Sequence, residues 1–263
     1  MAISLSSISK TTGLKAPRVL LYGVPGIGKT TFAAGAPSPI FLFTEDGAGL
    51  LELDSFPVLK TYEDTISALN ALLCEEHEFK TVALDSLDHL EPLVWDIVAK
   101  KAGTNSIEEI GFGKGYIEAL AYWRVILDLL DRLRVEKKMA VILISHSNIK
   151  RFDSPETEPY DRYQLKLHDK ASALMQEWSD CVLFCNYQTT IQRDKLSNGK
   201  DKARGVGTGQ RNIYTVEKPA YKAKNRFNLP EKNASFMGSI YDCITNQFTT
   251  RNNYKQWLVL AFN

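Results

Sequence analysis

The chain has 263 residues, of which 44% are hydrophobic and 24% charged, a composition that suits a globular protein with one full-sized core. Its 32 Lys and Arg residues balance 31 Asp and Glu residues, so the overall charge does not indicate a nucleic-acid partner. The four cysteines form no CxxC pair, and we therefore expect reduced thiols and no zinc site. No apolar run approaches the ~20 residues of a membrane span, and the first residues lack a signal-peptide pattern. The sequence thus predicts a cytoplasmic protein with no membrane contact.

Apolar runs and helix-period patterns alternate along most of the chain, which is typical of an α/β fold. Because parallel strands are buried on both faces, the unbroken apolar runs predict a mostly parallel, twisted sheet flanked by helices, with a β-rich C-terminal part. We expect strands at 18–22, 40–44, 81–85, 139–146, 180–185 and 212–217, and helices at 29–34, 62–76, 116–136 and 169–178.

Two polar segments interrupt this alternation. Residues 148–167 contain prolines and are too long for an idle turn, so we expect them to be functional or disordered. Residues 194–211 are rich in glycine and lysine and are predicted to be mobile.

A glycine-rich loop follows the first predicted strand and opens the first predicted helix. It reads GVPGIGKT at 23–30 and matches the Walker A pattern, in which glycines let backbone N–H groups wrap around phosphates. The Lys29 ammonium is expected to reach the β- and γ-phosphates, and the Thr30 hydroxyl to bind Mg²⁺. Thr31 would lie near the α-phosphate. The residues predicted to bind ATP are Gly23, Val24, Pro25, Gly26, Ile27, Gly28, Lys29, Thr30 and Thr31.

Asp85 ends a predicted apolar strand, as the carboxylate of a Walker B motif does. Together with Thr30 it is predicted to hold the Mg²⁺ ion that accompanies ATP. A helix cap is the alternative role, which Ser86 could fill equally well. One more strand separates the loop from Asp85 in the sequence, which favours the additional-strand ATPases over simple kinases.

ATP hydrolysis requires a group that activates the attacking water. In AAA+ proteins and many helicases a glutamate directly follows the Walker B aspartate, but Ser86 stands there, so that class fits poorly. Glu45 is the better candidate, because it follows the strand after the loop helix and would face the γ-phosphate at the carboxyl edge of the sheet. Asp46 is its nearest competitor, and a solvated loop acid is the alternative role.

Three stretches together resemble RecA-type recombinases, most of all the short phage-encoded RecA-like single-strand annealing proteins: FLFTEDG at 41–47, VALDS at 82–86 and ILISH at 142–146. The resemblance implies a RecA-like ATPase core at 17–235, in which Glu45 activates water. It also implies that His146 senses the γ-phosphate and relays its presence to DNA-binding loops; a buried histidine with satisfied hydrogen bonds is the alternative. An irregular segment at 1–16 and a segment of unknown role at 236–263 flank the core.

The stretch KAKNRF at 222–227 is similar to the Lys-Asn-Arg-Phe stretch of RadA-type proteins and the Lys-Asn-Lys stretch of RecA. In those families such basic residues reach the ATP of the neighbouring subunit. The resemblance therefore places Lys224 and Arg226 in the site in trans and implies a homo-oligomer, either a ring or a filament. A plain basic surface loop is the alternative. The catalytic set is then Glu45, Lys29, His146, Lys224 and Arg226.

Two segments are candidates for contact with single-stranded DNA. In residues 147–167 basic and aromatic side chains interleave, although acidic residues nearly cancel the charge. Residues 193–211 combine six Lys and Arg with two Asp and four glycines. Solvated hairpin tips would explain both without DNA. The candidate DNA-binding residues are Lys150, Arg151, Arg162, Lys195, Lys200, Lys202 and Arg204.

The resemblance implies a DNA-stimulated, oligomeric ATPase that acts in phage DNA recombination or single-strand annealing in the host cytoplasm. Its ligands would be ATP, Mg²⁺ and single-stranded DNA, with a single-strand DNA-binding protein as a further partner. No separate DNA-binding domain is evident, so annealing is favoured over strand exchange. Three alternatives stay open: an AAA-type helicase loader or packaging-associated NTPase, a small-molecule kinase, and a nucleotide-gated binding protein with little turnover.

Overall fold

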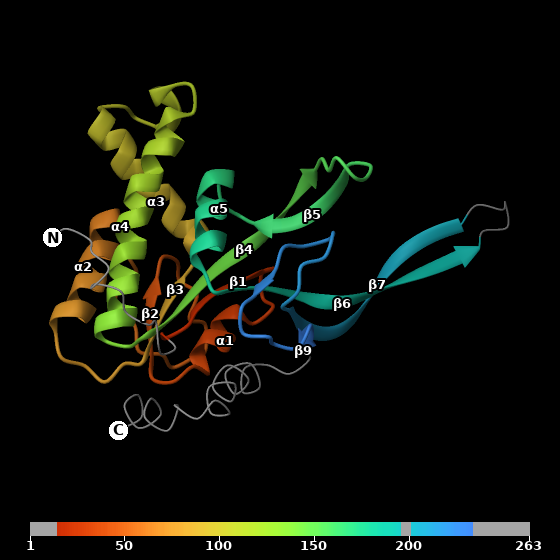
Figure 1. Cartoon of the computed structure of the whole chain (residues 1–263), viewed down its shortest axis with the longest axis horizontal. Helices are drawn as coiled ribbons and strands as arrows, with labels where there is room; N and C mark the ends of the chain where they lie inside the picture. The colour runs from red at the N-terminus through yellow and green to blue at the C-terminus, as the bar shows by residue number, and fades with distance from the viewer. Residues whose placement is uncertain (1–14, 196–200, 234–263) are drawn as a thin grey trace, which may run out of the picture.

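The computed structural model describes residues 15–195 and 201–233. A nine-stranded sheet forms the centre of this part of the chain, with helices on both faces (Figure 1). The elements are β1 (Arg18–Gly23), α1 (Lys29–Ala34), β2 (Pro39–Phe43), α2 (Tyr62–Cys74), β3 (Thr81–Asp85), α3 (Leu87–Ala102), the 3₁₀ helix η2 (Ile107–Ile110), α4 (Lys114–Glu136), β4 (Ala140–Phe152), β5 (Tyr160–Leu165), α5 (Asp169–Trp178), β6 (Cys181–Lys195), β7 (Asp201–Tyr214), β8 (Lys224–Asn225) and β9 (Lys232–Asn233).

The central part of the sheet is parallel. Strands follow the order β2-β3-β4-β1-β6-β7-β9, and the first five pair in parallel, whereas β7 and β9 extend the edge in antiparallel fashion. β4 therefore lies between β1, which leads into the glycine-rich loop, and β3, which ends at Asp85. This insertion is the arrangement expected of an additional-strand ATPase, and the predicted α/β fold is confirmed.

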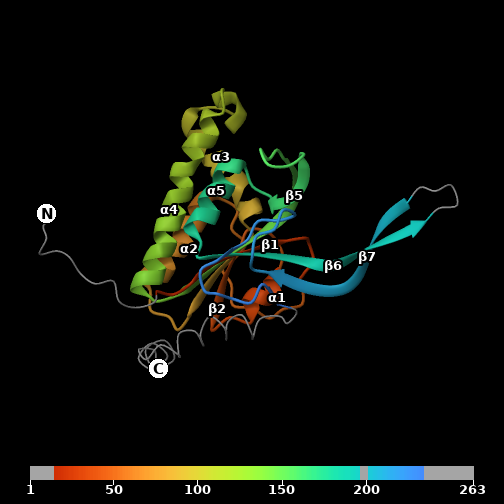
Figure 2. The same ribbon diagram turned by 45° about the vertical axis from the view of Figure 1, so that its right-hand side comes forward.

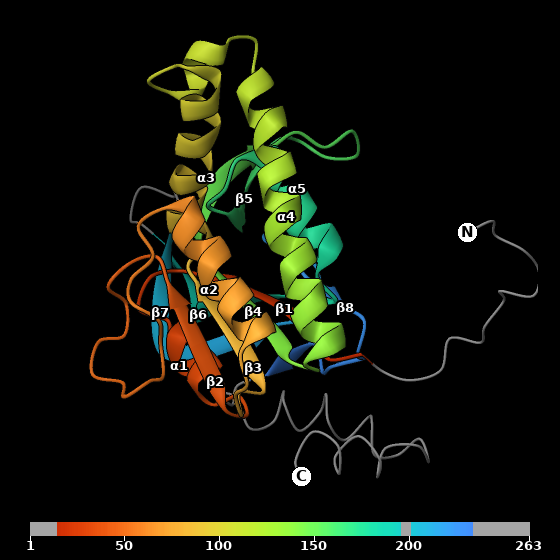
Figure 3. The ribbon, with the colours of Figure 1, turned by 90° about the vertical axis from the view of Figure 1, so that its left-hand side faces the viewer.

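Alternate residues of the parallel strands pack against helices on opposite faces of the sheet. Leu20 and Leu143 belong to the larger apolar cluster, where α2, α3, α4 and α5 cover the sheet and Trp123 of α4 is only 1% exposed. Leu21 and Ile144 belong to the smaller cluster on the other face, together with α1. Figure 3 shows α2 and α4 lying across the first face. Burial on both faces explains why these strands are unbroken apolar runs in the sequence.

Two β-hairpins extend from the sheet on the side away from α2 and α4 (Figures 1 and 2). Residues 148–167 were expected to be an irregular connection, but β4 continues through them to Phe152 and pairs with β5. Residues 194–211 were expected to be mobile. Those of them that the structure describes belong to the paired strands β6 and β7. The strand expected at 212–217 is the end of β7, which stops at Tyr214. Strands that leave the core lose the apolar runs by which strands are recognised in a sequence.

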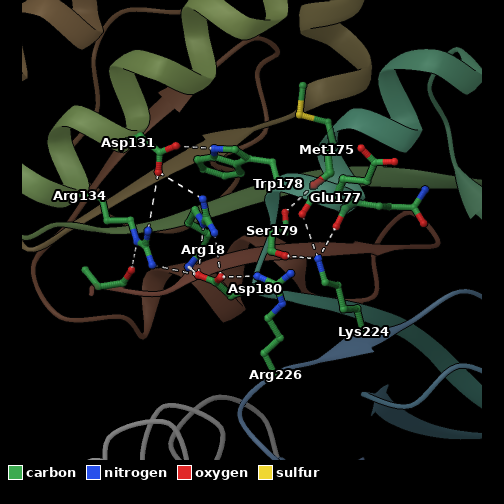
Figure 4. Close-up of polar contacts among 12 residues, drawn as sticks. Arg18, Asp131, Arg134, Met175, Glu177, Trp178, Ser179, Asp180, Lys224 and Arg226 are labelled. Carbon is green, nitrogen blue, oxygen red and sulfur yellow. Dashed lines mark hydrogen bonds and ion pairs between the residues drawn. The ribbon is translucent and has the colours of Figure 1, made fainter. Parts of the chain in front are cut away.

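Where β1 and β6 begin, the carboxylate of Asp180 binds three arginines (Figure 4). Arg18 donates two side-chain hydrogen bonds to it, the shorter at 2.9 Å, and nitrogens of Arg134 and Arg226 lie 3.3 and 3.4 Å from its oxygens. Burial alone would raise the pKa of Asp180, but the hydrogen bond and charge of Arg18 and the charge of Arg134 outweigh it, so the pKa lies below its usual value. The carboxylate ties the amino-terminal edge of the sheet to α4. Within the described residues, no helix has the length and apolar character needed to cross a bilayer.

Asp180→Asn should lower the free energy of unfolding by about 2–3 kcal/mol at neutral pH, because it removes the buried anion that Arg18 and Arg134 share and leaves them only the more exposed Asp131. A carboxyl whose pKa is lowered by folding stabilises above its unfolded pKa, and this contribution is lost as the pH falls through the folded pKa. In urea denaturation, the gap between wild type and variant should therefore close as the pH falls below about 4. Glu136→Gln disrupts only an exposed pair with Arg132 and should change stability little. A gap independent of pH would show that the lost charge is not the cause.

Candidate functional site

The glycine-rich loop joins the end of β1 to the start of α1 at the carboxyl edge of the sheet. Gly26 has φ 70° and Gly28, which caps α1, has φ 99°, values in the left-handed region that favours glycine. At Gly23 a Cβ atom would lie 2.1 Å from the carbonyl oxygen of Cys185 on β6, so a larger residue would force the two strands apart. Ile27 anchors the loop in the smaller apolar cluster. The loop thus has the strand–loop–helix context that phosphate binding by backbone N–H groups requires.

Three predicted ligands of ATP and Mg²⁺ lie together at this loop. Lys29 is 6% exposed, and its Nζ donates to the carbonyl oxygens of Gly23 and Val24; burial lowers its pKa, although the charge of Asp85 opposes this. The Thr30 hydroxyl donates to Oδ2 of Asp85 at 2.7 Å. Burial raises the pKa of Asp85, and the Thr30 hydrogen bond opposes that rise. A hydroxyl and a carboxylate supply the hard oxygen donors that Mg²⁺ prefers, so the pair fits this ion.

A cleft of about 380 Å³ opens beside the loop, next to the ends of β2 and β4. It brings together most of the residues predicted for the nucleotide site and adds Arg211, which the sequence analysis did not assign. Arg211 lies on β7 opposite Tyr187 of β6, whose hydroxyl donates to the carbonyl oxygen of Gly26 at 3.4 Å. Only this strand pairing places Arg211 near the loop, so no local motif could have identified it. The cleft is lined by Gly26, Gly28, Lys29, Thr30, Thr31, Glu45, Gly47, Ala48, Leu51, Asp85, His146 and Arg211.

Glu45 follows β2 and lines the cleft. Its Oε1 accepts a hydrogen bond from Oγ of Ser86 at 3.1 Å and lies 3.0 Å from Nδ1 of His89. The Thr44 hydroxyl donates to the carbonyl of Ser86 and accepts from its N–H, which ties the end of β2 to the end of β3. Asp46 is exposed and does not line the cleft. The geometry favours Glu45 over Asp46 as the residue that faces a bound phosphate.

His146 directly follows the buried part of β4, and the buried carboxylate of Asp88 orients it. Nδ1 of His146 lies 3.0 Å from Oδ2 of Asp88, and the backbone N–H of His146 donates to Oδ1 at 2.9 Å. Burial alone would raise the pKa of Asp88, but these hydrogen bonds outweigh it and hold the pKa well below its usual range. An ionised carboxylate only accepts, so Nδ1 of His146 donates to Asp88 and Nε2 takes no part in this contact. Sequence reasoning missed Asp88 and His89, whose only signal is their place in the first turn after Asp85.

Lys224 and Arg226 lie near the amino-terminal ends of the parallel strands, whereas the cleft lies at the carboxyl-terminal ends. Lys224 pairs with Val182 near the start of β6, whereas Gly23 of the loop pairs with Cys185 further along. The Lys224 ammonium donates to the carbonyl oxygens of Gln176, Glu177 and Ser179, and so caps the end of α5 (Figure 4). The Arg226 side chain is 56% exposed beside Asp180. Neither lines the cleft of its own chain; Arg226 is exposed, and Lys224 is partly exposed.

The candidate DNA-binding residues occupy different environments. Arg162 is a correction, because it is only 4% exposed: its guanidinium donates to Glu217 at 2.7 Å and lies over the Phe152 ring, so it supports the first hairpin from within. Lys150 is bound to Asp169 at 2.6 Å, whereas the side chain of Arg151 is 66% exposed. Three further candidates lie on the strands of the second hairpin: Lys195 on β6, and Lys202 and Arg204 on β7. Lys200 falls outside the described residues.

A family model described as an AAA domain matches residues 15–227 of the chain. No curated protein matches the chain. Ser86 stands where AAA+ proteins have a glutamate, and in the structure its hydroxyl donates to Glu45, which follows β2. Taken with the glycine-rich loop and the inserted strand β4, the match shows that the chain belongs to the AAA domain family, a family of P-loop NTPase type.

Proposed function

We propose that the protein is a RecA-type ATPase that works as an oligomer with shared ATP sites, is stimulated by single-stranded DNA, and acts in phage DNA recombination or single-strand annealing. The observation that carries the proposal is the course of β4 and β6. Both flank β1, which leads into the glycine-rich loop, and both continue past the cleft into the two hairpins. Continuous strands therefore connect the nucleotide to the surfaces proposed for DNA.

Each residue at the cleft has a defined task in hydrolysis. The loop N–H groups and the Lys29 ammonium bind the phosphates of ATP, which places the γ-phosphate beside Glu45. Thr30 and Asp85 hold Mg²⁺, which neutralises phosphate charge when bound. Glu45 accepts a proton from the attacking water, and its hydrogen bond from Ser86 keeps the carboxylate oriented for that role.

His146 is suited to relay the state of the nucleotide to the first hairpin. Its carbonyl oxygen accepts a hydrogen bond from the N–H of Lys166, the residue after β5, at 2.9 Å. The Lys166 ammonium also lies 3.5 Å from Oδ2 of Asp88, the carboxylate that orients His146. A γ-phosphate that attracts the His146 ring would therefore shift the base of the hairpin.

The proposed DNA surface lies along the two hairpins. Arg151 is exposed on the first. On the second, the strand register sets Lys202 opposite Asp194, Arg204 opposite Gln192 and Lys195 opposite Asp201. A ribbon that carries cations on both of its strands could follow the phosphates of a single strand, with an affinity that depends on the release of counterions.

ATP hydrolysis measured with and without single-stranded DNA, at several salt concentrations, tests the proposal. We expect stimulation that falls as salt rises. The triple variant Lys195→Ala, Lys202→Ala, Arg204→Ala should lose the stimulation and keep its DNA-independent hydrolysis. The control is the variant Lys60→Ala, Lys100→Ala, Lys114→Ala, which removes the same charge from exposed positions away from both hairpins. Absence of DNA binding at low salt would contradict the proposal and favour the AAA-type helicase loader or packaging-associated NTPase.

Arg211→Ala should lower kcat/KM for ATP by about tenfold to a hundredfold, the effect of losing one charge-assisted hydrogen bond to phosphate. The reason is that Arg211 lines the cleft while it lies on the returning strand of the second hairpin. DNA stimulation should fall as well, since the same strand serves both sites. Steady-state kinetics with and without DNA measure both effects, and Arg211→Lys should restore part of the loss. An unchanged kcat/KM would exclude a contact between Arg211 and the nucleotide.

A further inference from the structure

A second group of metal-ligating side chains, distinct from Thr30 and Asp85, combines two residues that line the cleft, Glu45 and His146, with His89, which does not line it. Glu45, His89 and His146 come from the end of β2, the first turn of α3 and the end of β4, and one ligand atom from each lies within 4.8 Å of the other two. We propose that these three residues bind a borderline transition-metal ion, Zn²⁺ in the first instance, and that this ion inhibits ATP hydrolysis by occupying Glu45.

The ligand atoms of the three side chains need to approach one another only slightly to bind one ion. Ligand atoms around a tetrahedral zinc ion, each about 2.1 Å from the metal, lie roughly 3.4 Å from one another. Nδ1 of His89 is already 3.0 Å from Oε1 of Glu45, and the rings of His89 and His146 stand edge to face with centroids 5.9 Å apart. Side chains that are between one-fifth and two-fifths exposed have room to make this approach, and they leave a fourth position for water.

The surroundings of His146 are those of a metal-binding histidine. The carboxylate of Asp88, whose side chain is 1% exposed, accepts a hydrogen bond from Nδ1 and leaves the Nε2 lone pair for a ligand bond. Carboxylate–histidine–metal arrangements of this kind fix the ring and increase its basicity as a ligand. The backbone N–H of His146 and the Ser145 hydroxyl donate to the same carboxylate, so Asp88 is held in place before any metal arrives.

The donor set selects the class of metal. Two imidazoles and one carboxylate suit zinc and its neighbours in the first transition row, whereas Mg²⁺ prefers an all-oxygen set such as that of Thr30 and Asp85. The structure therefore offers two neighbouring sets of metal ligands of different chemistry, and each set includes residues that line the cleft. Cysteine spacing gave no reason to expect zinc, because the histidine site is assembled from three separate elements.

The inhibitory part of the inference rests on the proposed function of Glu45. A carboxylate that donates an electron pair to zinc is a weaker proton acceptor, and its orientation towards the attacking water is lost. Because the loop and Lys29 are not ligands of this ion, ATP binding should persist while turnover falls.

The binding test uses nucleotide-free, full-length protein in a Cys74→Ser, Cys243→Ser background, titrated with Zn²⁺ against a chromophoric chelator. We expect one Zn²⁺ per chain, and an affinity that falls by about tenfold or more in His89→Gln and in Asp88→Asn. His89 is the safer variant, since its side chain is 40% exposed and its loss should not prevent folding. His77→Gln is the matched control, because His77 bonds to Leu72 and Phe79 and does not belong to the cluster of Glu45, His89 and His146. Equal zinc affinity in wild type, His77→Gln and His89→Gln would overturn the site.

Hydrolysis at a fixed, buffered concentration of free Zn²⁺ then tests inhibition. The wild type and His77→Gln should lose turnover, whereas His89→Gln should keep whatever activity it has without zinc. Zinc binding without inhibition would overturn the inhibitory role. If the wild type hydrolyses no ATP under any condition, the proposed function fails, and the chelator titration still decides whether the metal site exists.

Discussion

Glu45→Gln is expected to lower kcat for ATP hydrolysis by about 10²–10⁴-fold and to leave the affinity for ATP nearly unchanged. The amide keeps the shape of the side chain and can still accept the hydrogen bond from Ser86, but it cannot take a proton from water. The phosphate-binding residues lie on the glycine-rich loop and α1, so they are unaffected by the substitution. Single-turnover hydrolysis and equilibrium binding of a fluorescent ATP analogue measure the two quantities separately.

Asp46→Asn is the matched control for this prediction. It removes the same charge one residue further along, where the side chain is exposed and does not line the cleft. Its turnover should stay close to that of the wild type. The assignment fails if Glu45→Gln keeps full turnover, or if Asp46→Asn is the variant that loses it. Loss of both binding and turnover in Glu45→Gln would instead show that the end of β2 has rearranged.

The sequence was sufficient where a motif depends on neighbouring residues in the chain. The loop at 23–30 lies between a strand and a helix as predicted, because its glycines, Lys29 and Thr30 stand at the fixed local spacing of that motif. The contact between Thr30 and Asp85 joins residues 55 positions apart, yet it also followed from the sequence. The carboxyl ends of parallel strands meet at one edge of the sheet, so an acid that ends one strand lies near the loop that ends another.

Residues that only tertiary pairing brings to the cleft could not be predicted. Arg211 reaches it through the antiparallel register of β6 and β7, which no periodicity specifies in a glycine-rich segment. Asp88 stands in the first turn of α3, where an acid is expected to stabilise the helix dipole; its contact with His146 depends on β4 being inserted next to β3. The contact of Lys224 with the last carbonyl oxygens of α5 is a further one that no local pattern indicates.

The shared-site hypothesis leads to the second prediction. Lys29→Ala and Arg226→Ala should each be nearly inactive alone, and an equimolar mixture should recover roughly one quarter of wild-type activity. In a ring or filament with head-to-tail contacts, one in four interfaces then joins an intact loop to an intact arginine. The Arg226 side chain can move away from Asp180 at small cost in free energy. It is half exposed, and Asp180 keeps Arg18 and Arg134 as partners when Arg226 moves. It cannot serve its own cleft, since four residue steps along β6, about 13 Å of strand, separate Cys181, near Arg226, from Cys185, near the loop.

The control mixture combines Lys29→Ala with the double variant Lys29→Ala, Arg226→Ala. It contains intact arginines but no intact loop, and it should stay inactive at every ratio. Recovery in the first mixture should follow the product of the two fractions and reach its maximum at equal amounts, because each active interface needs one subunit of each kind. Activity that never rises above the sum of the two variants alone would show that Arg226 does not act in trans. Arg226 would then serve only to pair with Asp180 and stabilise the region where β1 and β6 begin.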